Sequence, residues 1–253
     1  MTEKTLSIGW LYPDLMSTYG DRGNIFSLQK RCEWRNIKTR VLAINSSTTI
    51  GDLEKVDIIF GGGAQDLEQE IVMRDLRGEK GKIIIDLINN HVPALFVCGA
   101  PQLMGKYYEP AVGKRIEGLG IFDITTTHPG PNQPRLIGNV VAKVELDGLS
   151  TTIVGFENHG GRTTLGKDAK PFARIIKGNG NNGKDKTEGV VYKNAIGCYF
   201  HGPLLPKNPA ITDWLLIKAL ERKYKEKIEL PFLDDSLENL AHSAIATRLG
   251  IGV

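Results

Sequence analysis

The stretch "PALFVCGAPQLMG", residues 93–105, decides the fold, because an apolar run ends abruptly at a cysteine that is followed by a glycine. The apolar run predicts a buried strand, and the residues after Cys98 favour a helix with Pro101 in its first turn. A strand, a tight turn and a helix in this order hold the side chain at the turn in an exposed and strained position. The positive end of the helix dipole also favours a thiolate at that point. Cys98 is therefore a candidate nucleophile, and a buried space-filling cysteine is the alternative.

Short apolar runs alternate with helical patterns on the amino-terminal side of this stretch. Residues 5–12 and 56–63 read as strands, and residues 24–36 and 81–91 read as helices. Such alternation predicts βαβ units around a parallel sheet. Sites in open α/β sheets form at the carboxyl ends of the strands. The three glycines that end residues 56–63 and Cys98 both stand at such ends, so we expect their loops to share one crevice.

The pattern changes after residue 120. "LIGNVVAKVEL" and "TTIVGFEN" read as strands joined by a tight "DGLS" turn, which predicts antiparallel pairing. The Gly- and Asn-rich residues 177–189 read as a loop, and two further strands end at His201. We expect one domain over residues 1–230 and a peripheral helix or tail over residues 231–253. The expected fold class is α/β, with a central, mostly parallel sheet and antiparallel additions.

The composition of the chain excludes several classes of function. Its net charge of +3, from 32 basic and 29 acidic side chains, is too mild for a nucleic-acid-binding protein. No apolar stretch reaches the roughly 18 residues of a membrane span, and residues 1–12 lack the apolar core of a signal peptide. The three cysteines form no CxxC pair, which argues against a structural zinc site. We therefore expect no metal site, and a cytoplasmic protein with free thiols.

A cysteine nucleophile needs a base within hydrogen-bond reach. His201 and His159 both follow apolar strands, and His201 is the better candidate because its strand is more apolar and ends in Gly-Pro. A structural role is the alternative for His201. Gly62 and Gly63 follow a buried strand without the Lys-Ser or Lys-Thr of a phosphate loop. They favour oxyanion binding or close packing over nucleotide binding, and the N–H group of Gly99 can also face a developing oxyanion.

The order of three motifs, "GGG", "CGAPQLMG" and "YFHGP", resembles that of class I glutamine amidotransferases of the cobyric-acid-synthase-like branch. Within that branch the chain is similar to the glutaminase subunits of lipid II isoglutaminyl synthases. The stretches that carry this similarity are "YGDRGN", "GGGAQDLEQ", "IEGLGIFD", "GFENHGGRT", "GNGNNGKDKTEG" and "HGPLLPKNP". The similarity runs from about residue 6 to residue 225 and does not cover the C-terminal tail. It implies a flavodoxin-like, three-layer sandwich.

The resemblance implies a glutaminase reaction at Cys98. The thiolate of Cys98 attacks the side-chain amide of L-glutamine, with His201 as the base. Backbone N–H groups of Gly99 and of Gly62–Gly63 stabilise the oxyanion. His201 then protonates the departing ammonia, and water releases glutamate from the thioester.

Two further residues match family positions for substrate binding. Gln102, four residues after the nucleophile, is implied as a contact of the bound glutamine. Arg135, in "PRLIGN", is implied as the partner of the substrate carboxylate, and a surface arginine is its alternative reading. No cofactor is implied for this chain.

The chain departs from the family pattern after the base. Many class I glutaminases carry a glutamate two residues after the histidine, whereas here His201 is followed by Gly202 and Pro203. Cys98 and His201 then form a dyad, which either works without an orienting acid or receives one from another chain. We favour the hypothesis that a partner chain supplies the orienting carboxylate. Glu157, in "GFENHGGRT", is a weaker internal candidate, and a structural role or a place in the partner interface is the alternative for this stretch.

The resemblance also implies a partner, because no ATP-grasp or P-loop signature is present. The implied partner is a MurT-like Mur ligase subunit, which would use ATP and Mg²⁺ to activate the α-carboxyl group of D-glutamate in lipid II. Ammonia from Cys98 would convert that group to D-isoglutamine in peptidoglycan synthesis. The alternatives are a glutaminase that serves a cobyric-acid-synthase-type amidoligase, a non-catalytic scaffold, and a stand-alone thiol hydrolase of related fold.

Overall fold

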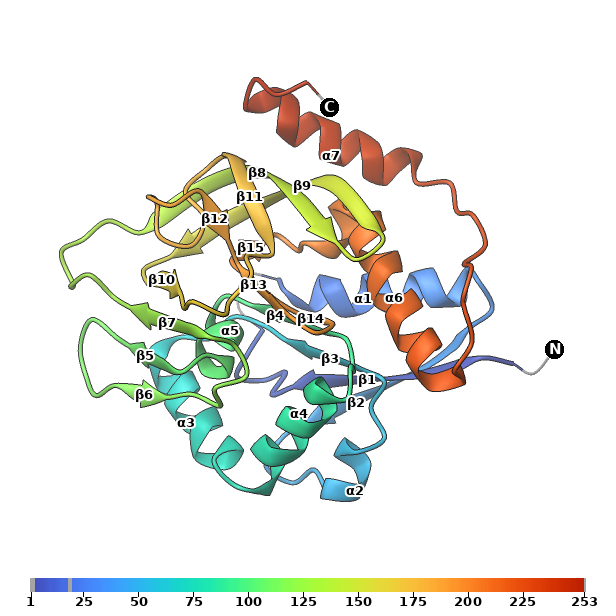
Figure 1. Cartoon of the computed structure of the whole chain (residues 1–253), viewed down its shortest axis with the longest axis horizontal. Helices are drawn as coiled ribbons and strands as arrows, with labels where there is room; N and C mark the ends of the chain where they lie inside the picture. The colour runs from blue at the N-terminus through green and yellow to red at the C-terminus, as the bar shows by residue number, and fades with distance from the viewer. Residues whose placement is uncertain (1–2, 18–19, 253) are drawn as a thin grey trace.

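A computed structural model of the chain describes residues 3–17 and 20–252 (Figure 1). Tyr19, the first residue of the "YGDRGN" stretch, lies outside the described residues. The central sheet has the strand order β13-β14-β4-β3-β1-β2, and only the edge strand β13 is antiparallel to its neighbour. These strands are β1 (Thr5–Leu11), β2 (Lys38–Ile44), β3 (Ile58–Gly61), β4 (Ala94–Val97), β13 (Val190–Tyr192) and β14 (Ala195–Cys198).

Helices cover both faces of this sheet, because its strands alternate apolar side chains between two cores. Ile58 and Phe60 of β3 belong to the core beneath α1 and α6, whereas Ile59 belongs to the opposite core. The three-layer α/β sandwich predicted from the sequence is therefore confirmed. The helices are α1 (Arg22–Glu33) and α6 (Pro209–Tyr224) on one face, and α2 (Ile50–Leu53), α3 (Asp66–Leu76), α4 (Glu79–Asn89) and α5 (Gly99–Met104) on the other.

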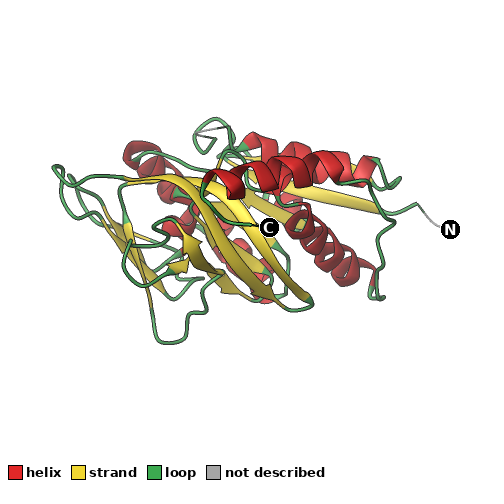
Figure 2. Ribbon diagram, turned by 90° about the horizontal axis from the view of Figure 1, so that it is seen from above, coloured by secondary structure: helices red, strands yellow, loops and turns green. Residues whose placement is uncertain are grey.

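One antiparallel and one mixed sheet form the strand-rich part, on the side away from the N-terminus (Figure 2). Their orders are β12-β11-β8-β9-β15 and β10-β7-β5-β6, in which β5 and β7 are the parallel pair. The predicted hairpin is the pair β8 and β9, joined at Asp147 and Gly148. The strands are β5 (Tyr107–Glu109), β6 (Ile116–Glu117), β7 (Ile124–Thr127), β8 (Leu136–Leu146), β9 (Leu149–His159), β10 (Arg162–Leu165), β11 (Ala173–Lys177), β12 (Thr187–Glu188) and β15 (Phe200–His201).

The C-terminal segment forms helix α7 (Ser236–Arg248), which packs on β8 and β9. Ala246 closes a small apolar cluster with Val141 and Val154. Arg31 of α1 pairs with Asp235 at the start of this helix. The helix therefore covers the outer face of the five-stranded sheet, while the proposed domain boundary at residue 230 stays a prediction. None of the helices in the described part of the chain is long and apolar enough to cross a membrane.

The chain passes from the central sheet to the five-stranded sheet between Cys198 and Phe200. β14 runs parallel to β4, with Cys198 paired with Val97, and the N–H group of Cys98 donates to the carbonyl oxygen of Cys198 at 2.8 Å. Two residues later β15 pairs with β9 in the five-stranded sheet. This change brings His201 beside the carboxyl ends of the parallel strands, where Cys98 lies.

Candidate active site

Cys98 occupies the turn between β4 and α5 in a conformation that few residues adopt. Its φ is 56° and its ψ is −99°. A positive φ is uncommon for a residue with a side chain and marks a position held by the surrounding structure. The residue is 9% exposed and lies on the wall of a cavity of about 620 Å³. The strained turn predicted from the sequence is present, but the predicted exposure is wrong, because Cys98 is buried and reaches only the wall of the cavity.

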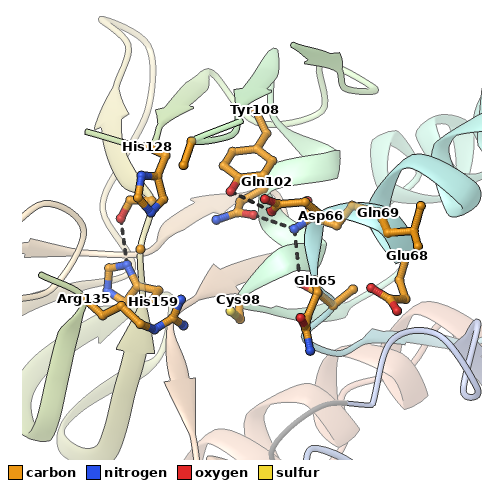
Figure 3. Close-up of a pocket in the computed structure, with 15 residues that line it drawn as sticks. Gln65, Asp66, Glu68, Gln69, Cys98, Gln102, Tyr108, His128, Arg135 and His159 are labelled. Atoms are coloured by element: carbon orange, nitrogen blue, oxygen red, sulfur yellow. Dashed lines mark hydrogen bonds between the residues drawn. The ribbon is translucent and has the colours of Figure 1, made fainter. Parts of the chain in front are cut away.

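The cavity has two unlike walls with Cys98 between them (Figure 3). Side chains from the start of α3 form one wall, including Asp66 and Gln69. Arg135 and His159, from the antiparallel strands and their loops, form the other wall. A volume of this size suits a small metabolite.

The glycines beside Cys98 allow backbone segments to approach closely. A Cβ atom at Gly99 would lie 2.9 Å from the backbone nitrogen of Ala64, and one at Gly62 would lie 2.4 Å from the carbonyl oxygen of Met16. Both distances are too short for a side chain, which supports the close-packing reading for Gly62. Oxyanion binding by Gly62 and Gly99 stays a prediction.

Gly63 has a different role from the one expected. Its N–H group donates to Oδ2 of Asp21 at 2.8 Å, so this donor points at a carboxylate and not at the substrate. A Cβ atom at Gly63 would lie 3.1 Å from Cε1 of His201 and 3.5 Å from Cβ of Cys98. The prediction of Gly63 as an oxyanion donor is therefore wrong in this conformation. Gly63 instead leaves room for the catalytic pair.

His201 is buried next to a carboxylate of the same chain. Its Nδ1 lies 3.0 Å from Oδ1 of Asp21, and the two side chains are 1% and 0% exposed. Burial disfavours the imidazolium form, but the charge of Cys98 and hydrogen bonds to Asp21 and Cys98 outweigh it and raise the pKa of His201 to about 10. This environment suits a thiolate–imidazolium pair.

Of the two sequence-based hypotheses for an orienting carboxylate, the internal candidate Glu157 is wrong, and a carboxylate from a partner chain stays a prediction. Asp21 of this chain lies at Nδ1 of His201. Glu157 lies elsewhere, where it accepts hydrogen bonds from the N–H groups of Asn179 and Gly180, both at 2.8 Å, and from Nδ2 of Asn179 at 2.6 Å. Glu157 thus anchors the Gly- and Asn-rich loop and does not touch His201.

Gln102 lines the cavity with its amide group held from both sides. Its Oε1 accepts from Nε2 of Gln69 at 3.0 Å, and its Nε2 donates to the hydroxyl group of Tyr199 at 3.2 Å. Tyr199 in turn lies 2.6 Å from the hydroxyl group of Thr163. The network fixes the rotamer of Gln102 beside Cys98, while its contact with substrate stays a prediction.

Arg135 reaches the cavity from the residue before β8. Its Nε and Nη2 donate to the side-chain oxygen and the carbonyl oxygen of Asn158 at 2.8 and 2.7 Å. These two bonds hold the guanidinium group at the rim, where it can face a carboxylate. The structure thus brings Arg135 to the same cavity as Cys98, which the sequence alone left open.

His159, the other histidine after an apolar strand, forms a neutral part of the wall. It stacks on Tyr199 with ring centroids 3.7 Å apart, and its Nδ1 lies 2.8 Å from the carbonyl oxygen of Gly161. Burial lowers its pKa to about 3. Within the described residues, no group of three or more His, Cys, Asp or Glu side chains is placed to hold a metal ion.

The parallel sandwich and the thiol on its strained turn define an α/β protein of the class I glutamine amidotransferase type. The chain belongs to the CobB/CobQ-like glutamine amidotransferase domain family, whose model matches residues 7–209. The resemblance seen in the sequence is confirmed.

Two relatives make the comparison more specific. The chain is 42% identical over 232 residues to the lipid II isoglutaminyl synthase (glutamine-hydrolyzing) subunit GatD of Streptococcus pneumoniae, covering 92% of this chain and 87% of that one. It is 41% identical over 236 residues to the subunit of the same name from Staphylococcus aureus, covering 93% and 91%. A solved glutamine amidotransferase matches with a TM-score of 0.57 and 15% identity, over 84% of this chain and 98% of that one, which shows the fold.

Proposed function

We propose that this chain is the glutaminase subunit of a lipid II isoglutaminyl synthase, which releases ammonia from L-glutamine for a second subunit. The observation that carries the proposal is the closeness of Cys98, on its strained turn at the cavity, to the buried His201. A Cβ atom at Gly63 would lie 3.5 Å from Cβ of Cys98 and 3.1 Å from Cε1 of His201. The two GatD relatives support this particular complex, because the match spans most of each chain.

The reaction follows from the charges of the pair. The thiolate of Cys98 attacks the carboxamide carbon of glutamine, and a tetrahedral oxyanion forms. When the intermediate collapses, the carbon–nitrogen bond breaks and His201 gives its proton to the departing ammonia. Water then attacks the γ-glutamyl thioester, with His201 taking the proton from that water. The carbon–sulfur bond breaks, and glutamate leaves with the thiolate restored.

Substrate orientation is assigned to two side chains of the cavity. Arg135 at the rim pairs with the α-carboxylate of glutamine. Gln102, held beside Cys98 by Gln69 and Tyr199, contacts the bound amino acid. The carboxamide then lies next to the thiol, which raises the rate through proximity and orientation.

The second subunit is of the Mur ligase type, MurT-like, and holds ATP and Mg²⁺. It activates the α-carboxyl group of D-glutamate in the lipid II stem peptide, and ammonia from Cys98 yields D-isoglutamine. The complex is cytoplasmic, where the nucleotide and reduced thiols are found.

The test is to supply the purified chain, alone and with its ligase subunit, with glutamine labelled by ¹⁵N in the side-chain amide. We expect glutamate release in both samples, and ¹⁵N in the amidated lipid II only when the ligase subunit and ATP are present. Release of glutamate without ¹⁵N transfer to lipid II would point to another amidoligase. No release of glutamate in either sample would overturn the glutaminase assignment.

Substitution of Gly63 by alanine should slow the reaction by displacing the base. The new Cβ atom would lie 3.1 Å from His201 and 3.3 Å from Oδ2 of Asp21, so one of them must move. A misplacement of about 1 Å can cost about 10²-fold in rate, so the smaller shift expected here should lower kcat by less than that factor. Gly51→Ala is the matched control, because nothing lies within 4 Å of its Cβ position. Equal kcat values for the two variants would contradict the close approach.

The pH dependence of the reaction should reflect the raised pKa of His201. Because that pKa is raised from 6.5 to about 10, the proton needed by the departing ammonia is kept through neutral pH and lost as pH rises toward 10. The charged or titratable groups that act on His201 are Cys98, Asp21, Glu188 and His159. We expect kcat/KM to hold across neutral pH and to fall on the alkaline side. A descending limb near the ordinary histidine value would show that the ion pair does not form.

A further inference from the structure

The carboxylate of Asp21 contacts two parts of the site at once. One oxygen, Oδ1, lies 3.0 Å from Nδ1 of His201, and the other, Oδ2, accepts the N–H group of Gly63 at 2.8 Å. The side chain is fully buried. In the described part of the chain, His201 is the one basic side chain within ion-pair distance of it. A buried carboxylate needs such compensation, and here the compensation is the catalytic base.

This contact decides which nitrogen of His201 faces the nucleophile. A carboxylate only accepts hydrogen bonds, so Nδ1 of His201 carries the proton shared with Asp21. The other nitrogen, Nε2, is then the one that exchanges a proton with Cys98 and the leaving group. A carboxylate that fixes a tautomer in this way acts on catalysis through orientation and charge.

The segment that carries Asp21 is locked to the loop that follows His201. The side chain of Asn24 donates to the carbonyl oxygen of Asp21 at 3.0 Å and accepts the N–H group of Leu205 at 2.9 Å. A Cβ atom at Gly23 would lie 2.5 Å from Cγ of Pro203, so only glycine allows this contact. The start of α1 and residues 202–205 therefore form one unit, which holds the distance between Asp21 and His201.

We propose that Asp21 is the positioning residue for His201, supplied by this chain itself, and that Gly23 and Asn24 hold it in place. The inference rests on the proposed function, since it assigns a part in the same reaction. It replaces a partner-supplied carboxylate with an internal one and gives Asp21, Gly23 and Asn24 of the stretch "GDRGN" related roles. The same carboxylate also ties Gly63 of the glycine loop to the base.

The test compares Asp21→Asn with Asp57→Asn in the full chain, alone and with its ligase subunit. Asparagine keeps the shape of Asp21 but turns an NH₂ group toward His201 or Gly63, both of which donate. Asp57 is the matched control, because it is also buried and hydrogen-bonded, to the N–H group of Ser7 and to Lys223, but it precedes β3 at the far end of the strand.

For Asp21→Asn we expect kcat to fall about 10²- to 10⁴-fold with a KM for glutamine within about threefold of the wild-type value. The alkaline limb of the pH profile should move down toward neutral pH, because Asp21 helps to raise the pKa of His201. A purely structural defect would leave the limb in place. Asp57→Asn should keep both kcat and the limb. A kcat of Asp21→Asn near the wild-type value, alone or in the complex, would overturn the inference while leaving the glutaminase function intact.

A second measurement does not depend on the folding of that variant. The wild-type chain with ¹⁵N-labelled histidine should show a downfield imidazole Nδ1 proton that disappears in His201→Gln. A wild-type spectrum without this signal would also overturn the inference. If the wild-type chain released no ammonia from glutamine, the glutaminase function itself would be wrong. That outcome is distinct from a failure of the role assigned to Asp21.

Discussion

Replacement of Cys98 by alanine is expected to abolish ammonia release from glutamine, with a loss in kcat of about 10⁴-fold or more. The variant keeps the cavity, the glycine loop and Arg135, so glutamine still binds. It lacks the atom that forms the thioester, and water at the same place is a far weaker nucleophile. Glutamate formation measured under single-turnover conditions, together with the Kd for glutamine, checks both halves of this expectation.

The other two thiols provide the control. Cys32 and Cys198 are buried, and burial raises the pKa of Cys32 to about 12 and that of Cys198 well above its ordinary value. Cys32→Ala and Cys198→Ala should lower the thermal midpoint by leaving small cavities, but should keep kcat per folded molecule. Wild-type release of ammonia by Cys98→Ala would show that the mechanism is wrong.

Replacement of His201 by glutamine is expected to lower kcat by a similar factor, about 10⁴-fold, because the thiol then has no base and the ammonia no acid. The charge of Asp21 is left without a cation in a buried site, so the variant should also be less stable than the wild type. Thermal midpoints measure the loss of stability. The kcat value calculated per folded molecule then measures the loss of catalysis separately.

The pair should also behave as a unit. The double variant Cys98→Ala with His201→Gln should lose about as much activity as either single variant, because the two residues perform one chemical step. His242→Gln is the control. His242 lies on α7, where its Nδ1 is 3.1 Å from the carbonyl oxygen of Lys207, and it takes no part in the proposed reaction. Losses that multiply in the double variant would indicate that the two residues act independently.

Local patterns were sufficient for the elements that carry the nucleophile. The apolar run before Cys98 and the helix-compatible residues after it predict the strand–turn–helix, and the structure has β4, a positive-φ residue and α5 in that order. The same reasoning predicts the parallel sheet and the β8–β9 hairpin, because both depend on short-range periodicity and turn residues.

Local sequence patterns did not predict the contacts between residues far apart in the chain. Asp21 and His201 are 180 residues apart, and no periodicity or spacing links them. The path of the chain from β14 into β15, and the lock between Gly23 and Pro203, exist only once three sheets have packed together. Glu157 lies in the motif "GFENHGGRT" near a candidate histidine in sequence, yet its carboxylate binds the loop at Asn179.

The sequence by itself therefore determined the α/β sandwich and predicted Cys98 at the end of β4 as the nucleophile and His201 after β14 as the base, since each inference depends on a local run of residues. Only the tertiary structure decided which carboxylate lies beside His201, which group accepts the N–H of Gly63 and which cavity Arg135 reaches. The physical reason is that hydrogen bonds and close packing between distant segments depend on positions in space, whereas strands, helices and turns depend mainly on neighbours in the chain.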